Sequence, residues 1–91
     1  MTKTEIEKGI KQIVDATYEI QDRIKEDGPV EWSPDGCYCY KIDEQYFLKR
    51  TKTRYEICDS SWHQIRHVAA DQDYLTILSS LIERYLKIID S

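Results

Sequence analysis

Three cysteines and two histidines are the residues of this chain whose types could support metal binding or nucleophilic catalysis. They stand in the order Cys37-x-Cys39, followed by Cys58, His63 and His67. Thiolates and imidazoles are preferred zinc ligands, and histidines four residues apart share one face of a helix. Structural zinc sites, however, generally separate paired cysteines by about two to four residues, and a Cys-x-Cys strand does not. These five residues are therefore the candidates for a zinc-stabilised adaptor, whereas the favoured interpretation has no metal or other cofactor.

Nucleophilic catalysis by Cys58 is a second use of the same residues, because Asp59 adjoins it and both histidines follow. Such a thiol needs electropositive surroundings and a base that a third group orients. No recognisable nucleophile motif surrounds Cys58, and Asp71 and Asp73 make the following sequence acidic. The chain also lacks a glycine-rich loop of the kind that cradles phosphates. We therefore predict that the protein is not an enzyme.

Charge is distributed unevenly along the chain. Residues 37–58 hold five Lys/Arg against three Asp/Glu, whereas residues 1–36 hold five against nine. The whole chain has a net charge of −4, which argues against general nucleic-acid binding, because neutralising phosphates requires an excess of Lys and Arg. An acidic protein is instead suited to docking on a basic partner. The expected partner is another protein, such as a nucleic-acid enzyme with a basic channel.

Two surfaces of opposite charge are candidates for contact with that partner. The acidic candidate combines residues of the first helix and the following loop: Glu19, Asp22, Glu26, Glu31, Asp35 and the loop aromatic Trp32. The basic candidate combines residues of the tyrosine-rich middle segment: Phe47, Lys49, Arg50, Lys52 and Arg54, interleaved with Tyr46 and Tyr55. Tyrosine, tryptophan and arginine anchor many protein interfaces. The alternative use of the basic surface is to bind a nucleic acid or a small ligand through stacking and phosphate contacts.

The sequence pattern predicts one α+β domain over residues 1–91, in the order α-β-β-β-α-α. Predicted helices cover 4–26, 61–70 and 74–89, predicted strands cover 37–42, 46–51 and 54–58, and a loop covers 28–36. Alternating apolar and polar residues indicate half-buried strands, and short connections predict an antiparallel three-stranded meander. The capping-box pattern of Ser61 with Gln64 predicts the start of the second helix, which would turn Trp62, Ile65 and Ala69 inward.

The two long helices carry the clearest periodicity. In the first helix, spacings of four and three residues form an apolar seam: Ile6, Ile10, Ile13, Thr17, Ile20 and Ile24. Gly9 is expected to weaken this helix by about 1 kcal/mol relative to alanine. The apolar arc of the last helix is wider than the roughly 100° that one neighbour covers, so this helix either lies centrally or forms a subunit interface. The two helices can pair through Ile10, Ile13, Ile20, Leu78, Leu81 and Tyr85, or the seam can join a homodimer.

These patterns predict a small acidic intracellular protein-interaction domain that acts as a non-enzymatic inhibitor or regulator of a partner protein. Immunity proteins and phage-encoded inhibitors of defence nucleases, including anti-CRISPR proteins, share this size and charge, although the analogy is one of class and not of sequence. An odd number of cysteines is typical of reduced thiols inside a cell. With no secretory signal and no run of about 18 apolar residues, the expected location is the cytoplasm, without membrane contact.

Overall fold

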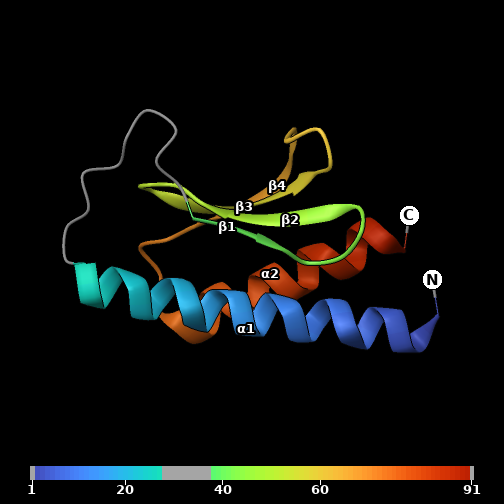
Figure 1. Ribbon diagram of the computed structural model, residues 1–91, viewed down its shortest axis with the longest axis horizontal. Coiled ribbons are helices and arrows are strands. Elements are labelled where there is room, and N and C mark those ends of the chain that lie inside the picture. The colour runs from blue at the N-terminus through green and yellow to red at the C-terminus, as the bar shows by residue number, and fades with distance from the viewer. Residues whose placement is uncertain (1, 28–37, 91) are drawn as a thin grey trace.

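The computed structural model describes residues 2–27 and 38–90, which form a helix, a four-stranded antiparallel sheet and a second helix (Figure 1). The elements are α1 (Lys3–Asp27), β1 (Tyr38–Lys41), β2 (Tyr46–Arg50), β3 (Arg54–Asp59), β4 (Gln64–Ala69) and α2 (Tyr74–Ile89). The expected small α+β domain with an antiparallel sheet is thereby confirmed. The predicted loop 28–36 lies outside the described residues, as do Glu31, Trp32, Asp35 and Cys37.

The strands lie side by side in the order in which they occur along the chain, β1-β2-β3-β4. Figure 1 shows the sheet as one layer and the two antiparallel helices as a second layer beneath it. Helix α1 contacts β1 and β2, α2 contacts β3 and β4, and the helices contact each other. One face of the sheet is therefore covered by helices, and we call the opposite face the open face.

The predicted helix 61–70 is wrong, because residues 64–69 form strand β4 and pair with β3. Ser61, the expected helix cap, lies instead in the β3–β4 turn, where its backbone N–H donates to the Asp59 carboxylate at 2.9 Å. A helix this short gains little stability by itself, whereas a strand here satisfies the backbone groups along the edge of β3. The predicted three-stranded meander is consequently a four-stranded one.

The apolar seam of α1 is used within the chain. Ile13 and Ile20 are fully buried, as are Leu81 and Tyr85 of α2 and Leu48 of β2, and all five belong to one hydrophobic cluster. Burying an aliphatic or aromatic side chain of this size stabilises a fold by roughly 1.5–3 kcal/mol. The two helices and the covered sheet face therefore share a single core, as the predicted pairing of the helices requires.

Gly9 is required by this packing and does not simply weaken the helix. A Cβ atom at this position would overlap the phenol ring and hydroxyl of Tyr85, so only glycine lets α1 approach α2 so closely. The Tyr85 hydroxyl donates to Asp43 Oδ2 at 2.6 Å. Asp43 Oδ1 also accepts from the backbone N–H groups of Gln45 at 2.7 Å and Tyr46 at 2.9 Å. This corner joins both helices to the β1–β2 turn.

Helix α2 covers the residues that the sequence predicts, and Asp73 caps it. The Asp73 carboxylate accepts from the backbone N–H of Thr76 at 3.1 Å and from the Thr76 hydroxyl at 2.6 Å. These hydrogen bonds hold the pKa of Asp73 below its ordinary value, because they stabilise the charged carboxylate.

Candidate binding site on the open sheet face

Strand alternation and cross-strand register determine which side chains occupy the open face. Successive residues of a strand point to opposite faces, and residues paired across strands point to the same face. Tyr55 and Ile57 of β3 are buried against the helices, so the residues that alternate with them lie on the open face. Their cross-strand partners extend each position into a row, which gives three rows. The rows are Lys41–Phe47–Cys58–Gln64, then Cys39–Lys49–Glu56–His67, then Arg54–Ala69. The open face thus combines cations, one carboxylate and an aromatic ring.

Trp62 adds a second aromatic ring to this face from the β3–β4 turn. Its ring stacks on Phe47, with 4.7 Å between the ring centroids and 29° between the planes, and its side chain is 48% exposed. The backbone of Trp62 has φ 66°, and it is the one non-glycine residue with positive φ in the described part of the chain. The Trp62 N–H donates to the carbonyl of Asp59 at 3.0 Å, which closes the turn. Glycine usually occupies this left-handed position in such hairpins.

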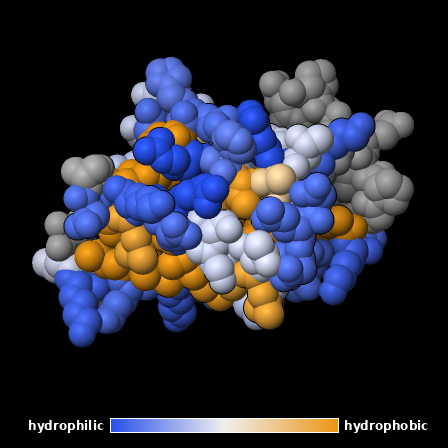
Figure 2. All heavy atoms as spheres, turned by 180° about the vertical axis from the view of Figure 1, so that it is seen from behind, coloured by the Kyte–Doolittle hydropathy of each residue, from blue (hydrophilic) through white to orange (hydrophobic). Residues whose placement is uncertain are grey.

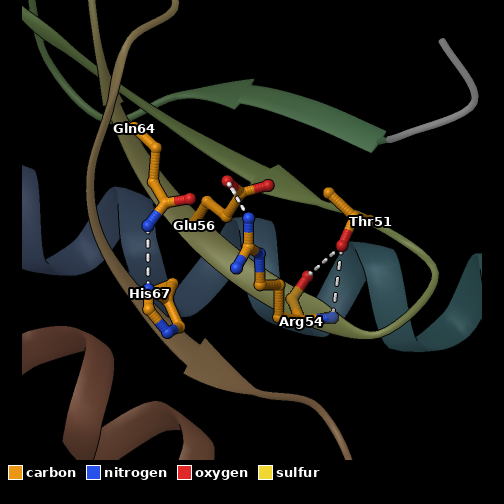
Figure 3. Close-up of polar contacts among 5 residues, drawn as sticks. All are labelled: Thr51, Arg54, Glu56, Gln64 and His67. Carbon is orange, nitrogen blue, oxygen red and sulfur yellow. Dashed lines mark hydrogen bonds and ion pairs between the residues drawn. The ribbon is translucent and has the colours of Figure 1, made fainter.

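Glu56 lies at the centre of the open face and is almost completely buried. It is 5% exposed, and its cross-strand neighbours are Lys49 on β2 and His67 on β4. Arg54 Nη2 donates to Glu56 Oε1 at 3.4 Å along the same strand (Figure 3). A buried carboxylate is costly unless a cation and hydrogen bonds compensate it. Arg54 is therefore held in place by Glu56, while its own side chain remains 42% exposed.

Two further contacts in Figure 3 fix the surroundings of this pair. Gln64 Nε2 lies 2.8 Å from His67 Nδ1, which ties the start of β4 to its middle. The Thr51 hydroxyl accepts from the Arg54 backbone N–H and donates to the Arg54 carbonyl, both at 3.2 Å. The backbone that carries Arg54 is thus pinned at the point where β3 begins.

The predicted basic surface is divided between the two faces of the sheet. Phe47, Lys49 and Arg54 lie together on the open face, and Lys52 is exposed in the β2–β3 turn. Arg50 lies on the covered face instead, with its guanidinium 5.0 Å from the ring centroid of the fully buried Tyr55. Burial raises the pKa of Tyr55, although the nearby Arg50 cation opposes that effect. Arg50 therefore contributes to packing on the covered face and is not part of the open-face surface.

The cysteines and histidines that the structure describes do not converge. Cys58 is buried on the open face and Cys39 is exposed on β1. His63 lies in the β3–β4 turn with its Nδ1 3.7 Å from Asp59, and His67 lies on β4. The expected helical His63/His67 pair is therefore wrong, because that segment is not a helix. Among residues 2–27 and 38–90, no group of three or more His, Cys, Asp or Glu side chains could hold a metal ion.

The acidic candidate surface is partly described. Glu19, Asp22 and Glu26 are exposed and recur every three or four residues along one side of α1. Glu19 is not a purely solvent-facing charge, because its carboxylate lies near enough to the phenol of Tyr40 on β1 to influence its pKa. Burial raises the pKa of Tyr40, and the neighbouring Glu19 carboxylate raises it further. This surface therefore lies beside the covered side of the sheet, away from the open face.

The outer side of helix α2 is a second surface with exposed apolar residues. Helix α2 buries Ile77, Leu81 and Tyr85 but exposes 70% of Leu75 and 38% of Leu86. Figure 2, which views the molecule from behind, shows hydrophobic residues gathered along the lower edge, in the helical layer. The wide apolar arc of α2 is thus only partly covered.

A cavity of about 360 Å³ lies between the first half of α1 and the β1–β2 turn. Lys8 and Lys41 line it together with the carboxylates of Glu5, Asp43 and Glu44. Its charges nearly balance, and the Asp43 carboxylate is already held by three hydrogen-bond donors. The cavity is therefore not strongly charged, and the Asp43 carboxylate has its hydrogen bonds within the protein.

Sequence reasoning missed Trp62 and Glu56 as members of a shared surface. The assignment of 61–70 to a helix placed Trp62 in the core, and Glu56 acquires its neighbours only when β4 is present. The local signal was the run Asp59-Ser60-Ser61-Trp62, which is rich in turn-forming residues directly after a strand.

Comparison with known proteins adds no family to this description. No protein-family model, no curated protein and no solved structure matches the chain. Neither described helix is long and apolar enough to cross a membrane. The function must therefore be argued from the surface itself.

Proposed function

We propose that this chain is a non-enzymatic protein-binding domain that docks on its partner through the open face. By occupying a surface of that partner, it would inhibit or regulate the partner's activity. The proposal is carried by one observation, the exposed Trp62 ring that is stacked on Phe47 by a backbone conformation unfavourable for tryptophan.

The conformation of Trp62 has an energetic cost that the fold does not need. A left-handed conformation costs a residue other than glycine about 1–2 kcal/mol. Glycine would close the same turn without that cost, and the Trp62 ring remains about half exposed. Backbone strain of this kind persists at sites of function. A large ring held rigidly at the surface is suited to burial in a pocket of a partner protein.

The surroundings of the stacked rings match the composition of protein interfaces. Tryptophan and arginine dominate binding energy at such interfaces, and polar groups usually form the rim around an apolar centre. Here Trp62 and Phe47 form the apolar centre, and Lys49 and Arg54 lie in the neighbouring rows. Both rings are positioned by sheet and turn backbone, which reduces the entropy lost on binding.

Binding of single-stranded nucleic acid is the second candidate, and the stacked pair beside Lys49 is the observation that favours it. Proteins of that kind stack successive bases on aromatic rings along a positively charged groove. The described part of the open face offers one stacked pair, and the net charge of the chain is −4. Protein binding therefore has the stronger support.

Substitution of Trp62 by glycine tests the proposal because it separates binding from folding. The change removes the ring and also relieves the backbone strain, so we expect the free energy of unfolding to stay within about 1 kcal/mol of the original value. Partner capture from the native host, followed by mass spectrometry, should lose specific partners with this variant. Leu75→Ala is the matched control, since it removes an exposed apolar side chain elsewhere. Equal capture by the glycine variant and the original protein would contradict the proposal.

A further inference from the structure

We propose that the segment of the partner which lies on the open face is acidic, and that Arg54, oriented by Glu56, selects it. This inference rests on the proposed function and names the chemistry of the partner. The open face carries the cations Lys41, Lys49 and Arg54, and Glu56 is its one carboxylate in these rows. Lys41 is paired with the Glu44 carboxylate at 3.1 Å, so Lys49 and Arg54 against the buried Glu56 leave the rest of the face with a charge of +1, although the whole chain is acidic.

Glu56 acts here as a positioning residue for Arg54. Its carboxylate is almost inaccessible to a partner, being 5% exposed, but it contacts Arg54 Nη2 at 3.4 Å. Arginine side chains lose much rotamer freedom on binding, and a guanidinium already held in place loses less. Because 42% of the Arg54 side chain is exposed, the planar guanidinium can meet a carboxylate from outside while Glu56 holds it from beneath.

The charged and aromatic parts of the open face are close enough for one segment to contact both. Phe47 and Lys49 are two residues apart on β2, which corresponds to about 7 Å along a strand. Lys49 lies directly opposite Glu56, and Trp62 covers Phe47. An acidic segment with an aromatic or apolar side chain therefore fits this arrangement, with that side chain on the rings and its carboxylates toward Lys49 and Arg54.

Acidic α1 does not prevent such binding, because it lies on the other side of the sheet (Figure 1). The sheet separates α1 from the open face (Figure 1), and charges in solution are screened over about 10 Å at 0.1 M salt. The local charge of the open face thus governs a close contact more than the net charge does. The phosphates of a nucleic acid carry the same sign of charge, so the test must separate the two classes of ligand.

The experiment uses the Trp32→Phe protein, in which Trp62 is the one remaining tryptophan and reports on the open face. Its tryptophan fluorescence is titrated with a random Glu–Tyr copolymer, a Lys–Tyr copolymer and a single-stranded oligothymidylate. We expect the Glu–Tyr copolymer to change the fluorescence saturably, with affinity falling at higher salt, and the other two probes to bind at least about tenfold more weakly.

Three variants in the same background locate the effect. Arg54→Lys keeps the charge but loses the planar fork, and we expect the Glu–Tyr copolymer to bind about fivefold more weakly. Glu56→Gln should weaken it by about threefold, since Arg54 is then held less firmly. Lys25→Ala removes one exposed charge on α1 and should leave affinity unchanged. Thermal unfolding of each variant checks that the fold is retained.

Each other outcome overturns a defined claim. Equal affinity for the Glu–Tyr and Lys–Tyr copolymers would contradict the claim that the partner segment is acidic. Equal affinity of the Arg54→Lys and original proteins for the Glu–Tyr copolymer would contradict the role of Arg54. No response to either copolymer would also overturn this inference, while Trp62-dependent partner capture would still support the proposed function. Binding of oligothymidylate in preference to the Glu–Tyr copolymer would overturn both proposals.

Discussion

The two faces of the sheet differ although they are made by the same strands. On the covered face, Leu48, Tyr55 and Ile57 are fully buried against α1 and α2. On the open face, Phe47 and Lys49, which flank Leu48 in the sequence, remain partly exposed. Because side chains alternate along a strand, the fold and the binding surface are encoded by interleaved residues. The two properties should therefore respond to different substitutions at neighbouring positions.

The largest expected effect compares adjacent residues of β2. Leu48→Ala should lower the free energy of unfolding by about 2–5 kcal/mol, because it leaves a cavity in the core. Phe47→Ala should cost only about 1–2 kcal/mol, because its ring is partly exposed, but should abolish partner capture. Urea unfolding and capture of both variants provide the measurement. Similar stability losses at the two positions would contradict the division between the faces.

Gly9→Ala tests how closely the helical layer is packed. Alanine normally stabilises a helix by about 1 kcal/mol relative to glycine. Here its Cβ would overlap Tyr85, so we expect a net loss of about 1–3 kcal/mol instead. Thermal and urea unfolding would reveal the sign, and the open-face fluorescence of Trp62 should be unchanged in the folded variant. A stabilised Gly9→Ala protein would show that the two helices do not approach as described.

Arg54→Ala tests how much the ion pair between Arg54 and Glu56 on the open face contributes to stability. Removing this cation leaves Glu56 buried without its partner, so we expect a loss of about 1–2 kcal/mol, discounted because Arg54 is partly exposed. The double variant with Glu56→Gln should recover part of that loss, since the unpaired charge is then absent. The control is Lys52→Ala in the exposed β2–β3 turn, which should have little effect. Additive effects of the two substitutions would contradict a direct interaction.

The smallest expected effect concerns a second copy of the chain. The buried part of the α1 seam is occupied by α2 and the sheet, so only the outer face of α2 offers exposed leucines. We expect sedimentation to give the mass of one chain, 10.8 kDa, across a wide concentration range. A mass that rises with concentration, and falls again in Leu75→Glu, would instead identify α2 as a homodimer interface.

Much of the helical layer could be predicted from the sequence, because the periodicity of α1 and α2 is local information. Strand β4 could not, since residues 61–70 fit both a capped helix and an edge strand. Pairing with β3 decides between them, and that pairing is not local. The same error concealed part of the candidate site. Strand alternation alone puts Phe47 and Lys49 on one face of β2 and Arg50 on the other, whereas the left-handed conformation that exposes Trp62 has no periodic signal.

The central claim is that the open face, and not the acidic side of α1, recognises the partner. Its most direct test compares the partner affinity of two separate variants. The first carries Phe47→Ala and Lys49→Ala on the open face, and the second carries Glu19→Lys, Asp22→Lys and Glu26→Lys on α1. We predict that the first variant loses at least about 100-fold in affinity, equivalent to about 2.7 kcal/mol, and that the second changes it by less than about threefold. A large loss with the α1 variant and none with the open-face variant would contradict the claim.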